Sequence, residues 1–511
     1  MDVLKKFSER PLVMICLLFA LALAFRLFFL FSVSGLEYCG WYHDSYHHWQ
    51  VAYYTLHVGL KQTPPRMWDL NGMEYFWGLL PTLMESFLLG MFNTASIVPF
   101  RIFNSVIGSL SVCLIYLLGK KHFSQQVGLF AALLAAVCPV LLGVDTSGML
   151  DPVGFAFLLL ALLVYDRSPF ACGFFLGLAS LAHIEFWFLA LGVCGCYLAF
   201  ERSGTKFAPS IIGWLTPMTP YFIFLQTRTG DWLYALKYNY AASVTGEWVT
   251  VSLPLGAQVL PRAVAVGFLA LAGAVLVYLV KNKPRGYIVH AFFWGFVAMQ
   301  GMIFGLTAYI MFYLVMGQVP RLLMDRLFAL NYYYISIIAA LIVIKLAAKR
   351  PVFHVRLKLN TKYVLLALTM IVYLLGFIPV TQQYFNAVYY EPYAKQTRTA
   401  DWINSNWQGG SVISSLVILN YRLIDAGFPY DRLFGSLYSP RYYGIENITE
   451  SYLWLKSLNA KWIVVDLNIL ENFPFLEDYP ENHPPFHLSV KPPEHEPVYY
   501  VNQTELEAIL P

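Results

Sequence analysis

Charged side chains are scarce in this sequence: Asp, Glu, Lys and Arg together make up 13% of the 511 residues, whereas hydrophobic residues make up 58%. The net charge of +4 is small and spread along the chain, which argues against a nucleic-acid-binding surface. A soluble protein rarely has so apolar a composition, so the chain is predicted to be a polytopic membrane protein.

Cysteine is also sparse, and the sequence has no CxxC pair. All the cysteines except Cys39 lie inside apolar runs, where they are expected to be packing residues, so no disulfide framework is predicted. No internal repeat is visible, which disfavours transporters built from inverted repeats.

The apolar residues gather in runs that predict membrane-spanning helices. The first run, from Pro11 to Val33, is longer than the apolar region of a signal peptide, so we interpret it as an uncleaved anchor. With it we expect about eleven spans. The later ones are 101–118, 128–144, 152–165, 170–185, 186–200, 208–226, 261–280, 288–316, 327–347 and 363–383.

Basic residues predict the orientation, because cytoplasmic loops of membrane proteins are enriched in Lys and Arg. With a cytoplasmic N-terminus, the loops on that side contain Lys120, Lys121, Arg167, Arg202, Lys206, Lys281, Lys283, Arg285, Lys345, Lys349, Arg350, Arg356 and Lys358. The outer face then contains segments 34–100, 142–152, 227–260, 317–326 and 384–511.

Two domains are expected: a transmembrane domain, 1–383, and a small extracytoplasmic α/β domain, 384–511. The second is richer in charge and proline. Its short β-like runs are Ser411–Ser415, Trp462–Val465 and Val498–Val501, and a helical pattern surrounds Asn447–Leu458. In the first outer loop, 34–100, the apolar stretch from Tyr75 to Phe92 contains Pro81 and Glu85, so we expect an interfacial helix there.

The first candidate site follows the first span and reads His43-Asp-Ser-Tyr-His-His48. Charge at a membrane boundary is costly unless it is solvated, paired or bound, so Asp44 is a functional candidate. Further acids on the predicted outer face are Asp145, Asp151 and Glu247. Carboxylates suit Mg²⁺ or Mn²⁺, and Asp44, Asp151 and Glu247 are the candidate metal ligands.

Asp151 adjoins the start of an apolar span, which favours function, whereas Asp145 is expected to be a solvated loop residue or a second-shell group. The imidazoles of His43, His47 and His48 are likewise second-shell candidates. Of the few outer cations, Arg326 and Arg321 are candidate phosphate-binding groups, because a guanidinium binds phosphate through two hydrogen bonds. Arg26, inside the first span, is expected to face the same cavity or to pair with an acid.

His43 and His47 also have the i, i+4 spacing of a zinc protease motif, with Asp44 in place of its glutamate. The shorter acid suits the general-base role poorly and no clear third ligand follows, so this reading is disfavoured. A transporter or lipid flippase is a further alternative. It would place polar groups near the bilayer midplane, whereas most acids here fall on the outer face.

These residues resemble the GT-C glycosyltransferases, membrane enzymes that use polyprenyl-phosphate-linked sugars. The catalytic subunits of oligosaccharyltransferases are similar in three motifs: Asp44-Ser-Tyr-His-His-Trp49, Gly148-Met-Leu-Asp151 and Ser243-Val-Thr-Gly-Glu247. Their WWDYG motif, which reads the acceptor asparagine sequon, is absent here. Oligosaccharyltransferase subunits are the most similar, and the protein O-mannosyltransferase and aminoarabinose-transferase branch, which has a similar layout, stays open.

The resemblance implies transfer of a sugar from a polyprenyl- or dolichyl-phosphate donor to a protein or glycan acceptor on the outer face. Asp44 would be the base or a metal ligand, Asp151 and Glu247 would complete a divalent-cation site, and Arg326 would stabilise the leaving phosphate. A single displacement would invert the anomeric centre.

Overall fold

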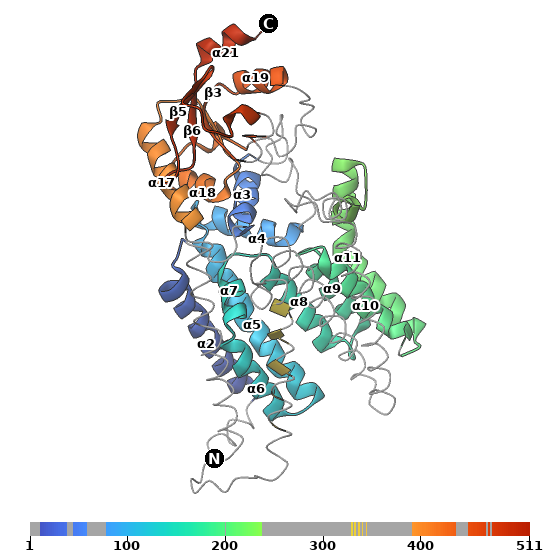
Figure 1. Ribbon diagram of the computed structural model, residues 1–511. Helices are drawn as coiled ribbons and strands as arrows, with labels where there is room; N and C mark the ends of the chain where they lie inside the picture. Colours follow the sequence, from blue (N-terminus) through green and yellow to red (C-terminus); the bar gives the residue numbers. More distant parts are fainter. Residues whose placement is uncertain are drawn as a thin grey trace, which may run out of the picture. The chain divides into compact units, whose positions relative to one another are not determined.

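The structure is a computed structural model of the 511-residue chain, shown as a ribbon in Figure 1. It describes residues 11–37, 44–58, 78–199, 201–237, 391–435, 448–466 and 473–510, together with single positions between 329 and 344 and residues 469–470. Within these residues the chain forms two compact units, one of helices and one built around a sheet.

The helical unit begins with α2 (Pro11–Phe28), which continues into a turn of π-helix (η1, Phe29–Ser34). From Arg101 onward it contains α5 (Val98–His122), α6 (Gln125–Ala136), α7 (Pro139–Thr146), α8 (Asp151–Val164), α9 (Pro169–Ser180), α10 (Glu185–Ala199) and α11 (Gly204–Thr229). Ser124 and Ser168 cap α6 and α9, each accepting a backbone N–H bond in the first turn.

Among the described helices, two are long and apolar enough to cross a membrane, Leu12–Ser34 and Val98–His122. The pair α6 and α7, bent by 62°, would make a third if it forms one broken span. The predicted run 128–144 is this pair, and it breaks before Pro139, whose ring cannot continue the preceding helix. Shorter apolar helices match the runs at 152, 170 and 186, but the count of about eleven spans is not confirmed.

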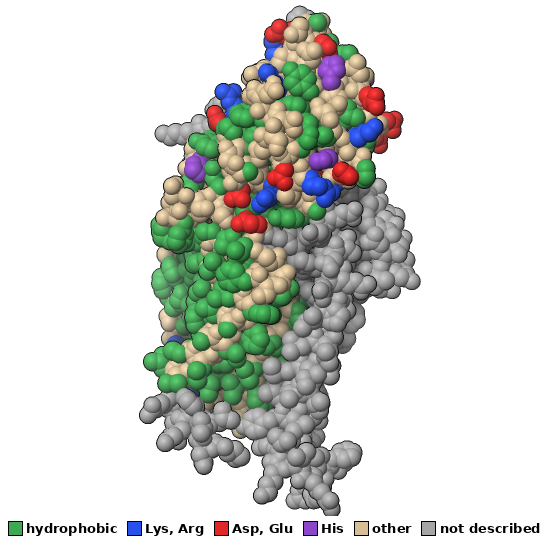
Figure 2. Space-filling view, turned by 90° about the vertical axis from the view of Figure 1, so that its left-hand side faces the viewer, with side chains coloured by type: hydrophobic (Ala, Val, Ile, Leu, Met, Phe, Trp, Pro, Cys, Tyr) green, Lys and Arg blue, Asp and Glu red, His purple; other side chains and the backbone are tan. Residues whose placement is uncertain are grey.

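The two sides of α2 differ in their exposure. Leu17, Leu21, Phe25 and Phe28 are exposed along one side, whereas Leu18, Ala22 and Arg26 are buried along the other. Figure 2 shows hydrophobic side chains covering the visible face of the helical unit, while the charged side chains in view lie over the other unit. This distribution fits a helical unit whose outer face is solvated by lipid tails.

The second unit contains a mixed six-stranded sheet of order β2-β1-β3-β6-β5-β4. Its strands are β1 (Ser411–Ile413), β2 (Leu433–Phe434), β3 (Ala460–Val464), β4 (Asn482–His483), β5 (Phe486–Val490) and β6 (Val498–Val501). β2, β1 and β3 run parallel, and β6, β5 and β4 follow in antiparallel steps.

Helices cover both faces of this sheet. The unit contains α3 (Asp44–His57), α17 (Glu391–Asn406), α18 (Val417–Asp425), α19 (Ile448–Ser457), α21 (Gln503–Ile509) and most of α4 (Leu79–Phe92), with single 3₁₀ turns at Tyr430–Arg432 and Pro474–Leu476. Side chains alternate between faces along a strand. Val412 accordingly packs with α3 and α18, and Ile413 packs with the cluster of α19 and α21.

The sequence predicted this α/β domain outside the helical bundle, and its small sheet is confirmed. The three β-like runs correspond to β1, β3 and β6, and the helical pattern corresponds to α19. β2, β4 and β5 were missed. The expected helix in the stretch from Tyr75 to Phe92 is α4.

Close helix packing around glycines gives a first prediction. A Cβ on Gly173 of α9 would lie 1.8 Å from the Ser210 carbonyl oxygen of α11, whereas one on Gly195 of α10 would meet nothing within 4 Å. Gly173→Ala should therefore lower the thermal unfolding temperature in detergent, at a cost of about 1–3 kcal/mol for overpacking. Gly195→Ala, the matched control, should leave it unchanged or raise it slightly, since alanine is the better helix former. Equal unfolding temperatures for both variants would contradict this packing.

Candidate active site

Asp44 and Asp151 are each the first residue of a helix. Asp44 begins α3 and is half-buried, and Asp151 begins α8 with 8% of its surface exposed. The N-terminal turn of a helix carries unpaired N–H groups and a partial positive charge, which stabilises a carboxylate there. Asp44 belongs to the sheet-containing unit and Asp151 to the helical unit, so each position is described by itself.

The hexapeptide around Asp44 follows the first span, as expected, but at an interval and not directly. The span ends at Ser34, and Asp44 starts the separate helix α3. His47 is half-buried and His48 is buried on α3, with their ring centroids 6.3 Å apart, while His43 lies outside the described residues.

α3 is held by the C-terminal part of the chain. Trp49 packs edge-on against Tyr421 of α18, at 4.7 Å between ring centroids, and donates a hydrogen bond to the Ala95 carbonyl oxygen at 2.7 Å. Tyr421 in turn donates its hydroxyl hydrogen bond to the Glu37 carboxylate. Because Asp44 starts this helix, its position depends on contacts made by residues more than 350 positions later in the chain.

Two carboxyl groups in this unit have pKa values shifted by their surroundings. Burial raises the pKa of Asp425 at the end of α18, and the nearby charge of Glu37 adds to that effect. Burial also raises the pKa of Glu85 on α4 well above its ordinary value. Glu85 is fully buried, and neither carboxyl oxygen has a hydrogen-bond partner among the described residues. In the sequence, Glu85 only supported the prediction of a helix at the membrane–water interface.

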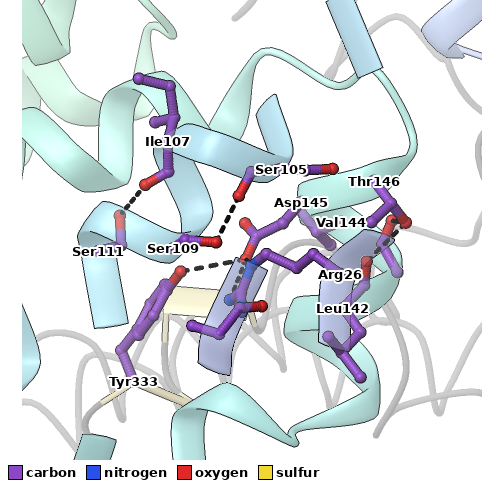
Figure 3. Close-up of polar contacts among 12 residues, drawn as sticks. Arg26, Ser105, Ile107, Ser109, Ser111, Leu142, Val144, Asp145, Thr146 and Tyr333 are labelled. Atoms are coloured by element: carbon purple, nitrogen blue, oxygen red, sulfur yellow. Dashed lines mark hydrogen bonds and ion pairs between the residues drawn. The ribbon is translucent and has the colours of Figure 1, made fainter. Parts of the chain in front are cut away.

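Asp145 is not a solvated loop residue, which corrects the sequence-based expectation. It lies in the last turn of α7, fully buried, and forms an ion pair with Arg26 of α2 (Figure 3). Arg26 donates to Asp145 Oδ2 from Nη2 at 2.6 Å and from Nε at 2.9 Å, and Tyr333 donates to the same oxygen at 3.4 Å. The expectation that Arg26 pairs with an acid is confirmed.

Helix α5 packs closely against this ion pair, and a glycine at the contact leaves the space that the pair needs. A Cβ on Gly108 would lie 2.3 Å from the carboxyl carbon of Asp145, so only glycine fits there. The ion pair and its contact with Gly108 bring α2, α5 and α7 together. A buried charge pair whose carboxylate is already bonded to a guanidinium and a tyrosine is suited to fixing helices together rather than to proton transfer.

Two polar residues on α5 that the sequence analysis did not single out bind the turn before Asp151. Arg101 donates from Nε to the Thr146 carbonyl oxygen at 2.6 Å, and Asn104 donates from Nδ2 to the Met149 carbonyl oxygen at 2.6 Å. Arg101 also donates to the Gly35 carbonyl oxygen at 2.7 Å and to the Ser34 hydroxyl at 2.9 Å. A sequence signal exists: Arg101, Asn104, Ser105 and Gly108 recur at helical spacing along an apolar run.

The remaining predicted site residues, Glu247, Arg321 and Arg326, lie outside the described residues. Within the described part of the chain, no three His, Cys, Asp or Glu side chains come together in a way that could hold a metal ion. The described residues therefore do not by themselves fit the divalent cation that the sequence analysis expects.

Residues 79–226 match the model of a family described as dolichyl-phosphate-mannose-protein mannosyltransferase. The matched segment extends from α4 into α11 and includes both Asp145 and Asp151. Over this segment the chain is similar to a GT-C family. GT-C proteins are multi-pass membrane proteins, in agreement with the apolar helices, while the predicted cytoplasmic N-terminus stays a prediction.

Solved structures of an oligosaccharyltransferase from Archaeoglobus fulgidus are similar at 14% identity. The complex with an inhibitory peptide and a dolichol-phosphate has a TM-score of 0.49, covering 92% of this chain and 71% of that one. The complex tethered to an acceptor peptide has a TM-score of 0.49, covering 98% and 74%, and the complex with Zn and sulfate has 0.45, covering 88% and 68%. A comparison with curated proteins finds no match.

The buried ion pair gives a second prediction. Arg26→Met and Asp145→Asn each leave a buried charge without its partner, and each should destabilise the protein by about 3–5 kcal/mol. The double variant removes both charges and should lose less than the sum of the single losses. Thermal unfolding of the four proteins in the same detergent measures the difference. Additive losses would show that the two side chains do not interact.

Proposed function

We propose that the chain is a membrane glycosyltransferase that transfers a sugar from a polyprenyl-phosphate-linked donor to an acceptor on the outer face. The observation that carries the proposal is the family match over 79–226. The matched family is described by its donor, dolichyl-phosphate-mannose, and by its acceptor, protein. Dolichyl-phosphate-mannose is therefore the first donor to test, with a protein hydroxyl as the first acceptor.

The two helix-initial acids have the chemistry that the reaction needs. In the proposed mechanism the Asp44 carboxylate takes the proton of the acceptor hydroxyl while the acceptor oxygen attacks the anomeric carbon. The bond from that carbon to the phosphate oxygen breaks, and the lipid phosphate leaves with the bonding electrons. Attack opposite the leaving group inverts the anomeric centre.

Asp151 is proposed to orient the acceptor or the sugar beside the reacting carbon, from the start of α8. Arg326, with Arg321 as the second candidate, is proposed to bind the leaving phosphate, whose negative charge grows as the bond breaks. Membrane lipid is the surrounding solvent for the isoprenoid tail of the donor, and the exposed apolar side of α2 is compatible with such surroundings.

A divalent cation, Mg²⁺ or Mn²⁺, remains part of the proposal with Asp44, Asp151 and Glu247 as its ligands. It would neutralise phosphate charge on the donor. Because the described residues do not assemble a complete ligand set, the mechanism above uses no step that passes through the metal.

Substitution of the two acids tests the catalytic assignment. Asp44→Asn and Asp151→Asn keep the shape of the side chain and remove its charge, and each should lower transfer by at least about 100-fold, the scale of a general base. The measurement is transfer of labelled mannose from dolichyl-phosphate-mannose to a Ser/Thr-rich peptide, in membranes with matched protein amounts.

Asp166→Asn is the matched control. Asp166 follows the other end of α8 and pairs with Lys121 at 2.7 Å, so its loss should leave transfer unchanged. Full transfer by both Asp44→Asn and Asp151→Asn would reject the proposed roles.

Chelation tests the cation separately. Treatment of the membranes with EDTA should abolish transfer, and Mg²⁺ or Mn²⁺ added in excess should restore it, because carboxylates are hard oxygen ligands. Transfer that survives EDTA would remove the metal from the proposal and leave the acid–base roles of the carboxylates in place.

A further inference from the structure

We propose that Arg101 and Asn104 are positioning residues that hold the turn between α7 and α8 and thereby fix the direction of the Asp151 carboxylate. The inference rests on the proposed function, since it assumes that Asp151 takes part in transfer. It concerns four hydrogen bonds within the helical unit, all made by α5.

The two side chains bind opposite ends of one short turn. Arg101 and Asn104 are three residues apart and so lie on the same face of α5. One donates to the carbonyl oxygen of Thr146, the last residue of α7, and the other to that of Met149, two residues before Asp151. Both bonds are 2.6 Å long.

These carbonyl groups lie in a buried turn, since Met149 and Leu150 are almost fully buried. The last carbonyls of a helix have no partner within that helix, and an unpaired buried carbonyl costs about 1–3 kcal/mol. Gly148 has a φ of +85°, a left-handed conformation that favours glycine. Arg101 and Asn104 supply from α5 the donors that water supplies in an exposed turn.

Asp151 follows this turn directly. Leu150, the residue before α8, makes no side-chain capping bond, and the helix continues with Pro152. The start of α8 is thus set by the turn itself. A carboxylate only 8% exposed has little freedom to compensate by rotation, so a shift of the turn is transmitted to Asp151.

Arg101 also fixes a second segment. Its remaining donors bind Gly35 and Ser34, at the end of η1, from which the chain enters the loop that contains Asp44. Loss of Arg101 would therefore disturb two segments at once. Asn104 makes the cleaner test, because its amide donates to the turn and not to η1.

The test replaces Asn104 with leucine, which has a similar volume and no donor. In the same mannose-transfer assay, Asn104→Leu should lower kcat by about 10- to 100-fold, the effect of a small misplacement of a catalytic group, with KM for dolichyl-phosphate-mannose unchanged. A variant that is merely less folded would transfer at the native rate per folded molecule, so kcat is expressed per folded protein, counted by size-exclusion chromatography in detergent.

Ser109→Ala is the matched control. Ser109 is as buried on α5 as Asn104, but its hydroxyl donates within its own helix, to the Ser105 carbonyl oxygen at 2.7 Å. It should keep kcat per folded molecule. Asn104→Ala gives a second variant with the same loss of donor if the leucine variant does not reach the membrane.

The outcomes separate the inference from the proposed function. If Asp151→Asn loses transfer while both Asn104 variants keep the native kcat per folded molecule, the positioning role is rejected and the catalytic role of Asp151 stands. If Asp151→Asn transfers at the native rate, the proposed function fails at its own residue.

Discussion

The helical unit depends on two buried guanidinium groups, and each binds a different kind of partner. Arg26 binds a side chain, the carboxylate of Asp145, and so joins α2 to α7 beside α5. Arg101 binds backbone, the carbonyl groups at the ends of η1 and α7, and so fixes where two connections begin. Both guanidinium groups are fully buried, so protein atoms must satisfy their donors, and these bonds therefore constrain the helix positions.

The sheet-containing unit shows a second constraint, which acts over a long sequence distance. α3 and α4 come from the first outer loop, yet the aromatic residues of α3 share a core with α18 and with strands near the C-terminus. The hydrogen bond from Tyr421 to Glu37 joins the two segments. The C-terminal part of the chain therefore supports α3, the helix that begins with Asp44.

Sequence patterns within a single segment predicted several of its helices and strands. Hydrophobic runs predicted α5, α8, α10 and α11, and short β-like runs predicted β1, β3 and β6. The break at Pro139 was open to prediction, since proline ends helices, but the run around it was taken as continuous. The error at Asp145 has another cause. Its partner, Arg26, is 119 residues away, and no local pattern reveals which of two neighbouring acids is paired inside the bundle.

That pairing also decides which of the two acids is available for chemistry. Asp145 already accepts two N–H bonds from Arg26 through one oxygen, and it is sealed by α5 at Gly108. A carboxylate so engaged stabilises the bundle at the expense of any role as a base. Asp151, six residues later, is placed by bonds to the backbone before it and lies at a helix start, where negative charge is favoured. The same face of α5 therefore acts on the two acids in different ways. Asp145 is held by its ion pair with Arg26, and Asp151 is oriented by the turn that precedes it.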